Sequence, residues 1–190
     1  MDKYGIDAEP VLAKAGLARG QLAQERGGVS VASQYRFLEL AATEANDSLL
    51  GLHLAADMDL RDAGILFYLA ASSATVAEAL ENLARYVGTT NEAVLVEISR
   101  HKDETVVTVR PVRAHYEPRR QFSEFTALAV IRALRKQTNR DFAPSRMSFA
   151  HGRNSDLKGD RSHSAMPGRV RTRHRQLGLT AECHGAADSF

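Results

Sequence analysis

The sequence predicts an α+β fold in which N-terminal helices and a central helical hairpin pack on a small antiparallel sheet, with the order β-β-α-β. Three observations lead to this prediction. Leu60 to Val87 contains two apolar segments joined by the short polar run Ser72 to Thr75. After Gly88, apolar and polar residues alternate with a period of two, which is typical of strands. Helical spacing then returns from Arg119 to about Gln137, followed by a short strand from Arg146 to His151.

The central hairpin is expected to lie in the middle of the core. Ala63 to Ala71 contains no charged residue, so we expect this segment to be covered nearly all round. Thr75 and Glu78 have the spacing of a capping box, in which hydroxyl and carboxylate each accept from a free backbone N–H. The second helix has an apolar row at helical spacing, made of Val76, Leu80, Leu83 and Val87.

Cap residues mark the helices that precede this hairpin. Asp7 begins a short helix with Pro10 in its first turn, and this helix ends near Gly16. A single turn is expected over residues 21–26, and Ser30 or Ser33 caps a helix that runs to about Glu44. A brief helix follows the break at residues 46–48. The expected inner faces of these last two helices are Tyr35, Leu38 and Ala42, and Leu49, Leu52 and Ala56.

The strands and the last helix are predicted from periodicity. Residues 94–99 and 105–110 form a β-hairpin around the polar turn His101 to Glu104, and Pro111 ends the second strand because proline cannot donate to a ladder. The helix from Arg119 to about Gln137 has a broad predicted inner stripe of Phe122, Phe125, Leu128, Ala129 and Ala133.

Composition limits the classes of protein that fit. The 190 residues suit one domain, and a single cysteine, Cys183, excludes an internal disulfide framework. The start MDKYGIDAEP does not resemble a signal peptide, and no apolar run approaches the ~20 residues that span a bilayer. We therefore expect a soluble, cytoplasmic protein.

The net charge of +2 arises entirely near the C-terminus. Residues 160–190 contain five Lys and Arg against three Asp and Glu, and the totals of 25 and 23 leave 20 of each sign for residues 1–159. Nucleic-acid binding needs clustered cations, so no direct contact with nucleic acid is expected.

Four blocks of the sequence resemble a known family. LAKAGL, SLLGLHLA, AGILFYLAASSATVAEALENLARYV and RMSFAH are similar, in content and order, to the N-terminal, arabinose-binding-type domain of AraC-type transcription regulators. The resemblance runs from about Tyr4 to Leu157. Ala74 and Ala77 stand where the family often has proline and glycine, and both changes are compatible with a helix start.

The resemblance implies a domain that senses a small-molecule effector or dimerises, as a homodimer or as a heterodimer with intact regulators. In the family, two helix-turn-helix motifs that bind DNA follow this domain. Here thirty-three residues follow Leu157, and we expect neither motif among them. We predict a sensor domain over residues 1–158 and an irregular, basic, disordered tail over residues 159–190.

The tail has a second reading, as an out-of-frame translation. Permitted codons for Arg161 to Leu179, read from the second base of Arg161, can encode DRILRCPVEFAQDTDSWV. That string resembles the short helix and last strand that the family has after the segment matching RMSFAH. The hypothesis is a frameshifted or truncated regulator without its own DNA-binding module.

Four residues are predicted to line an effector pocket. Tyr68, Tyr86 and Phe125 are aromatic residues on helices that pack over the sheet, and Arg85 offers a charge to an acidic effector. Ordinary core packing explains the aromatic residues as well. An exposed ion pair with Glu81 explains Arg85 as well.

No catalytic, metal or cofactor site is predicted. His53 is read as a partly exposed helix residue and His151 as a strand-end residue, rather than as an effector contact or a metal ligand. The three tail histidines and Cys183 fit no zinc-finger spacing, and no nucleophile motif surrounds Ser72 or Ser73. The alternative to a truncated regulator is a stand-alone small-molecule-binding module unrelated to transcription, and an enzyme ranks third.

Overall fold

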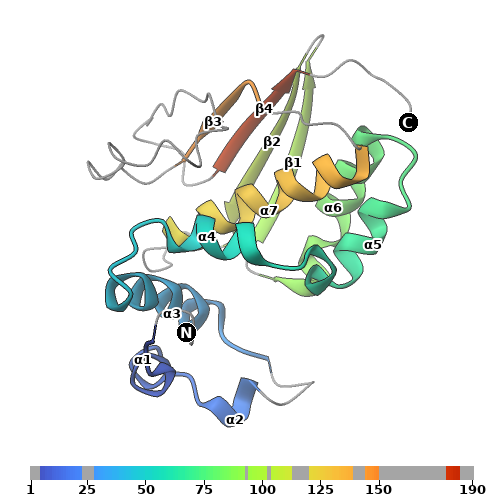
Figure 1. Ribbon diagram of the computed structural model, residues 1–190. Coiled ribbons are helices and arrows are strands. Elements are labelled where there is room, and N and C mark those ends of the chain that lie inside the picture. The colour runs from blue at the N-terminus through green and yellow to red at the C-terminus, as the bar shows by residue number, and fades with distance from the viewer. Residues whose placement is uncertain are drawn as a thin grey trace. The chain divides into compact units, whose positions relative to one another are not determined.

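The computed structural model describes residues 5–22, 28–92, 94–101, 104–112, 120–138, 144–149 and 179–184 (Figure 1). The chain divides into two compact units. The first comprises residues 1–57 and 115–126, and the second comprises residues 58–114 and 127–190. Helix α7 (Arg120–Thr138) contributes its first seven residues to the first unit and the rest to the second.

The first unit is helical in its described part. It contains α1 (Ala8–Lys14), α2 (Arg19–Leu22), α3 (Val31–Glu44), α4 (Leu50–Asp57) and the start of α7. Two apolar clusters form its interior: Val11, Ala41, Ala42 and Leu50 in one, and Leu12, Ala15 and Leu17 in the other. Tyr35 on α3 is 1% exposed and packs against Phe122 of α7 at a ring-centroid distance of 4.7 Å.

The predicted caps form in this unit. Asp7 Oδ1 accepts a hydrogen bond from the backbone N–H of Glu9 at 3.0 Å. Ser30 Oγ accepts from the N–H of Ser33 at 3.1 Å, so Ser30 is the N-cap of α3. These short-range bonds explain why both helices begin where the sequence predicts.

The predicted inner side of α4 is wrong. The most buried residues of α4 are Leu50, Gly51 and Ala55, whereas Leu49 before the helix and Leu52 and Ala56 on it are half-buried. The reason is that Gly51 packs against the backbone of α7, which turns that side of α4 inward.

The second unit combines helices with a four-stranded antiparallel sheet of order β1-β2-β4-β3. Its elements are η2 (Leu60–Ala63), α5 (Ile65–Ala71), α6 (Val76–Thr90), β1 (Val94–His101), β2 (Glu104–Pro111), β3 (Arg146–Ser148), β4 (Leu179–His184) and the remainder of α7. Helices α6 and α7 cover one face of the sheet (Figure 1). The main cluster between these layers contains Ala70, Ala79, Leu80, Val107 and Leu134. The α+β class is therefore confirmed.

The hairpin of β1 and β2 forms as predicted. Its register pairs Val94 with Pro111 and His101 with Glu104. Val96 and Ile98 pack against the main cluster, whereas Glu97 points to the other face and pairs with Arg110. This alternation between an apolar and a solvated face is usual for an antiparallel sheet with helices on one side.

The predicted strand order β-β-α-β lacks one strand. Strand β4 follows β3 in the sequence and pairs with both β2 and β3, so the order is β-β-α-β-β. Strand β4 lies inside the predicted tail, where no strand was expected. Strand β3 is shorter than predicted. His151 lies outside the described residues, and so do residues 159–178 and 185–190. The division at residue 158 stays a prediction.

The central hairpin forms, with one correction. Thr75 Oγ1 accepts from the N–H of Glu78 at 3.1 Å, as the capping box predicts, whereas Glu78 Oε2 accepts from the N–H of Ala74 at 2.7 Å, one residue before the N-cap. The prediction that α5 is covered nearly all round is wrong, because Ile65 is 56% exposed and Tyr68 is 60% exposed. The helix contacts η2 and α6, and these neighbours cover one side of it.

The inner stripe of α7 also differs from the prediction. Its most buried positions are Gln121, Glu124, Ala127, Ile131 and Leu134, whereas the five predicted residues are half-buried. A search for apolar spacing passes over this row because two of its members are polar.

Candidate functional site

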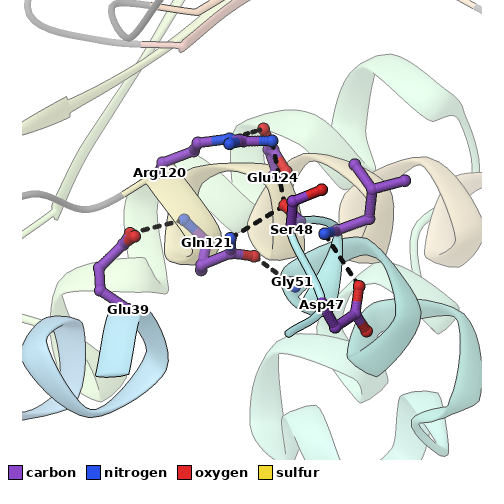
Figure 2. A network of polar contacts seen from close by, with 8 residues as sticks. Glu39, Asp47, Ser48, Gly51, Arg120, Gln121 and Glu124 are labelled. Atoms are coloured by element: carbon purple, nitrogen blue, oxygen red, sulfur yellow. Dashed lines mark hydrogen bonds and ion pairs between the residues drawn. The ribbon is translucent and has the colours of Figure 1, made fainter. Parts of the chain in front are cut away.

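A buried polar network joins three helices of the first unit around Gln121 (Figure 2). We call Glu39, Ser48, Gly51, Arg120, Gln121 and Glu124 the Gln121 cluster. The Gln121 side chain is central: Oε1 accepts from the N–H of Gly51 at 2.7 Å, and Nε2 donates to the carbonyl oxygen of Ser48 at 3.1 Å. Its backbone N–H donates to Glu39 Oε1 at 2.8 Å. The Glu39 carboxylate thereby satisfies one of the free N–H groups in the first turn of α7.

An ion pair completes the cluster. Arg120 Nε donates to Glu124 Oε1 at 2.8 Å, and the two side chains are only 14% and 8% exposed. Arg120 Nη2 also donates to the carbonyl oxygen of Ser48 at 3.0 Å. Buried charges cost free energy unless they are paired and hydrogen-bonded, and Glu124 Oε1 forms such a hydrogen-bonded ion pair with Arg120.

A second polar pair lies at the start of α4. Asp47 Oδ1 accepts from the N–H of Leu49 at 3.0 Å, and Asp47 Oδ2 lies 2.7 Å from His53 Nδ1. The predicted break is also present, because Asn46 has a positive φ of 48°. His53 is partly exposed, at 29% for its side chain, in line with the prediction.

The Gln121 cluster was missed in the sequence. Its two groups of residues lie far apart in the sequence, with separations of 70 for Gly51–Gln121 and 82 for Glu39–Gln121. Local signals existed only for the break at residues 46–48 and for the i,i+4 spacing of Arg120 and Glu124. Amide, carboxylate and guanidinium groups bound mainly to backbone atoms suit fixing helices in place, so we read the cluster as the support of the domain rather than as a reactive centre.

The residues predicted to line an effector pocket are divided between the two units. Tyr68, Arg85 and Tyr86 lie in the second unit, on the α5–α6 hairpin, and Phe125 lies in the first. Tyr86 and Phe125 are half-buried, and Arg85 is exposed. The carboxylate of Glu81, the alternative partner of Arg85, pairs with Arg100 of β1 at 2.5 Å.

Tyr68 belongs to a small surface group. Its ring meets that of Phe67 edge to face, with centroids 5.4 Å apart, and Lys136 Nζ lies 5.4 Å from the Phe67 centroid. Both contacts are within the usual range for aromatic and cation–π pairs. Nearby, Asp59 caps η2 by accepting from the N–H of Arg61 at 2.9 Å, and its Oδ2 lies 2.5 Å from Arg61 Nη2.

The Asp59–Arg61 pair gives a testable titration. The hydrogen bonds from the Arg61 side chain and backbone hold the pKa of Asp59 well below its usual range. Because the folded pKa lies below the unfolded value of about 4, this pair contributes stability above that pH and loses it as the pH falls. We expect the Asp59 carboxyl carbon signal in NMR to titrate well below pH 4 in the wild type and to return towards that value in Arg61→Gln. A midpoint near pH 4 in the wild type would contradict the pairing.

Two further features are absent from the described residues. Among them, no group of three or more His, Cys, Asp or Glu residues could hold a metal ion. No helix in the same parts of the chain is long and apolar enough to cross a membrane.

Comparison with known proteins identifies the family. The model described as "Arabinose-binding domain of AraC transcription regulator, N-term" matches residues 5–182. The chain belongs to this family. The resemblance seen in the sequence is thus confirmed, and the AraC-type match extends beyond Leu157 into the segment that contains β4.

A solved structure agrees at the level of the fold. The transcriptional regulator CdpR from Pseudomonas aeruginosa is 17% identical to this AraC-type domain, with a TM-score of 0.59 over 93% of the chain. The match covers 53% of CdpR, so the chain spans about half the length of that regulator. No protein with a curated functional description matches the sequence.

Proposed function

We propose that this chain is the effector-sensing and dimerising part of an AraC-type transcription regulator, acting in the cytoplasm without catalysis, metal or cofactor. The observation that carries the proposal is the family match over residues 5–182, to which the shared fold with CdpR adds support. The family is described as an arabinose-binding domain. For this chain we propose a small-molecule effector.

The residues proposed for effector contact are those that the sequence singles out. Tyr68 and Tyr86 lie in the second unit and Phe125 in the first, and each of these aromatic residues is a separate candidate for contact with an effector. Arg85 is exposed beside Tyr86 and would select an acidic effector. In the proposed mechanism, effector binding changes how the domain pairs with a second copy or with an intact regulator.

Thermal melting against a metabolite panel tests effector binding. A ligand present at 100 times its Kd stabilises the folded state by about 2.7 kcal/mol, so a specific effector should raise the Tm by several degrees. We expect Tyr86→Ala to reduce this shift and Gln137→Ala, on α7, to leave it unchanged. Turnover of a panel compound by the purified chain would contradict the proposal, as would the absence of any shift across sugars, amino acids and organic acids.

The proposed loss of a DNA-binding module is tested separately, by sequencing the gene. The out-of-frame reading of residues 161–179 leads us to propose that a frame change separates this domain from a DNA-binding module. Sequencing the locus in all frames should then reveal helix-turn-helix coding in a shifted frame downstream. A locus without such coding would instead favour the stand-alone binding module.

A further inference from the structure

Strand β4 fills a position inside the sheet of the second unit, between β2 and β3 (Figure 1). It runs antiparallel to both neighbours, with six residues in register with β2 and three in register with β3. Adjacent strands lie about 4.8 Å apart, so β2 and β3 stand about 10 Å from one another, and one extended segment fills the space between them. We call the position between β2 and β3 the β4 slot.

Both walls of the β4 slot are fixed by packing on the helices of the unit. Val107 of β2 belongs to the main cluster, together with residues of α5, α6 and α7. Met147 of β3 is 4% exposed and lies in another cluster with Ala127 and Ile131 of α7, against which Val109 of β2 also packs. Strand β2 pairs in addition along its whole length with β1. The two walls should therefore stay in place when β4 leaves the slot.

Strand β4 closes the slot against an entropic cost. It begins at Leu179, far along the chain from the end of β3 at Ser148, and the free-energy cost of closing a loop rises with its length. The residue of β4 that stands opposite both Val107 and Met147 is Ala181, whose side chain is a single methyl group. So small a residue adds little cross-strand stabilisation, and the backbone hydrogen bonds of β4 carry most of it. An extended peptide can offer the same backbone groups to β2 and β3.

We propose that β4 is an exchangeable strand, and that the β4 slot binds an extended peptide in its place when β4 detaches. This is strand addition inside a sheet, in which the backbone bonds to β2 and β3 provide affinity and the side chains provide specificity. Because the Ala181 position stands opposite the buried Val107 and Met147, the slot should accept a small apolar residue there and reject a charged one. The partner is therefore an extended protein segment with a small apolar residue at its centre.

The exchange itself is independent of effector sensing, whereas its consequence for regulation rests on the proposed function. The family match ends at residue 182, inside β4. In a full-length regulator the DNA-binding motifs follow this domain, so a peptide in the slot would release the segment that connects the sheet to them. The slot would then control that connection.

Binding of a labelled peptide to the wild-type chain tests the exchange directly. The probe is a fluorescent peptide of residues 177–186 with Cys183→Ser, and its binding is followed by fluorescence anisotropy. We expect saturable binding, with a Kd at least about 10-fold higher for the same peptide with Ala181→Pro, because proline cannot donate to a strand ladder. A peptide with Ala181→Glu should bind more weakly as well.

A disulfide assay shows where the peptide binds. Thr105 of β2 stands opposite Cys183 of β4, and residues in that arrangement have Cα atoms about 4.5–5.5 Å apart, within the range that a disulfide spans. In the Thr105→Cys, Cys183→Ser chain, a peptide of residues 177–186 that keeps its cysteine should form a mixed disulfide with β2. Leu95→Cys in the same background is the matched control, since Leu95 is 47% exposed on β1, outside the slot. That control should not distinguish the wild-type peptide from the Ala181→Pro peptide.

An internal disulfide provides the opposite test. In a Thr105→Cys chain that keeps Cys183, oxidation should join β4 to β2 and abolish peptide binding, and reduction should restore it. Thermal melting should show that each variant stays folded. Failure of the wild-type chain to bind the peptide overturns the exchange, as does binding that survives the internal disulfide or equal binding of the proline peptide. None of these results changes the effector-dependent melting that tests the proposed function.

Discussion

Replacing Gln121 by leucine is expected to lower the free energy of unfolding by about 2–3 kcal/mol, because it leaves a buried backbone donor without its partner. The side chain is 2% exposed, and its amide oxygen accepts from the N–H of Gly51 at 2.7 Å. Leucine has a similar volume but cannot accept that bond. The carbonyl oxygen of Ser48 keeps one donor, Arg120, so the cost falls mainly on Gly51.

Urea unfolding followed by circular dichroism measures this effect, and the Tm should fall by roughly 4–12 °C. Gln137→Leu is the control, because it also replaces glutamine by leucine on α7 but lies near the other end of the helix, outside the Gln121 cluster. Equal losses in the two variants would mean that the network adds nothing beyond the exchange of an amide for an alkyl group.

The parts of the fold that could be predicted depend on neighbours in the sequence. Asp7, Ser30, Thr75 and Glu78 accept hydrogen bonds from residues two to four positions away, so a local sequence pattern contains both partners. The hairpin of β1 and β2 is similarly local, because its strand pairs include residues as close in sequence as His101 and Glu104. Local patterns therefore predicted where these elements begin.

The remaining features depend on partners far away in the chain. Gln121 is buried through bonds to Glu39, Ser48 and Gly51, which lie at least 70 positions away, and polar residues give no periodic signal of burial. Strand β4 is specified by backbone pairing with β2 and β3 rather than by an alternating pattern of its own.

The exposed side of α5 shows a different limit of sequence reasoning. An uncharged run such as Ile65–Ala71 is compatible with a buried helix and equally with an interface helix, because both avoid charge. The sequence therefore could not show whether Tyr68 is buried or exposed. The effector contacts of Tyr68, Tyr86, Arg85 and Phe125 stay predictions until a ligand is found.

Gly51→Ala is expected to destabilise the first unit by at least about 3 kcal/mol, at the upper end of the usual cost of overpacking. A Cβ atom on Gly51 would press on the carbonyl oxygen of Gln121 and lie 2.8 Å from its carbonyl carbon. Backbone atoms in a helix cannot rotate away, so α4 would have to separate from the first turn of α7. That movement would also lengthen the bond from the Gly51 N–H to the Gln121 amide, which couples this substitution to Gln121→Leu.

Gly88→Ala on α6 is the matched control, because a Cβ at that position meets nothing within 4 Å. Alanine is the better helix former by up to about 1 kcal/mol, so Gly88→Ala should leave stability unchanged or raise it. In a double-mutant cycle, Gly51→Ala with Gln121→Leu should cost less than the sum of the two single changes, because each disrupts the same contact. Additive losses would show that the close approach of α4 and the Gln121 hydrogen bond stabilise the unit independently, and would contradict the coupling inferred from the cluster.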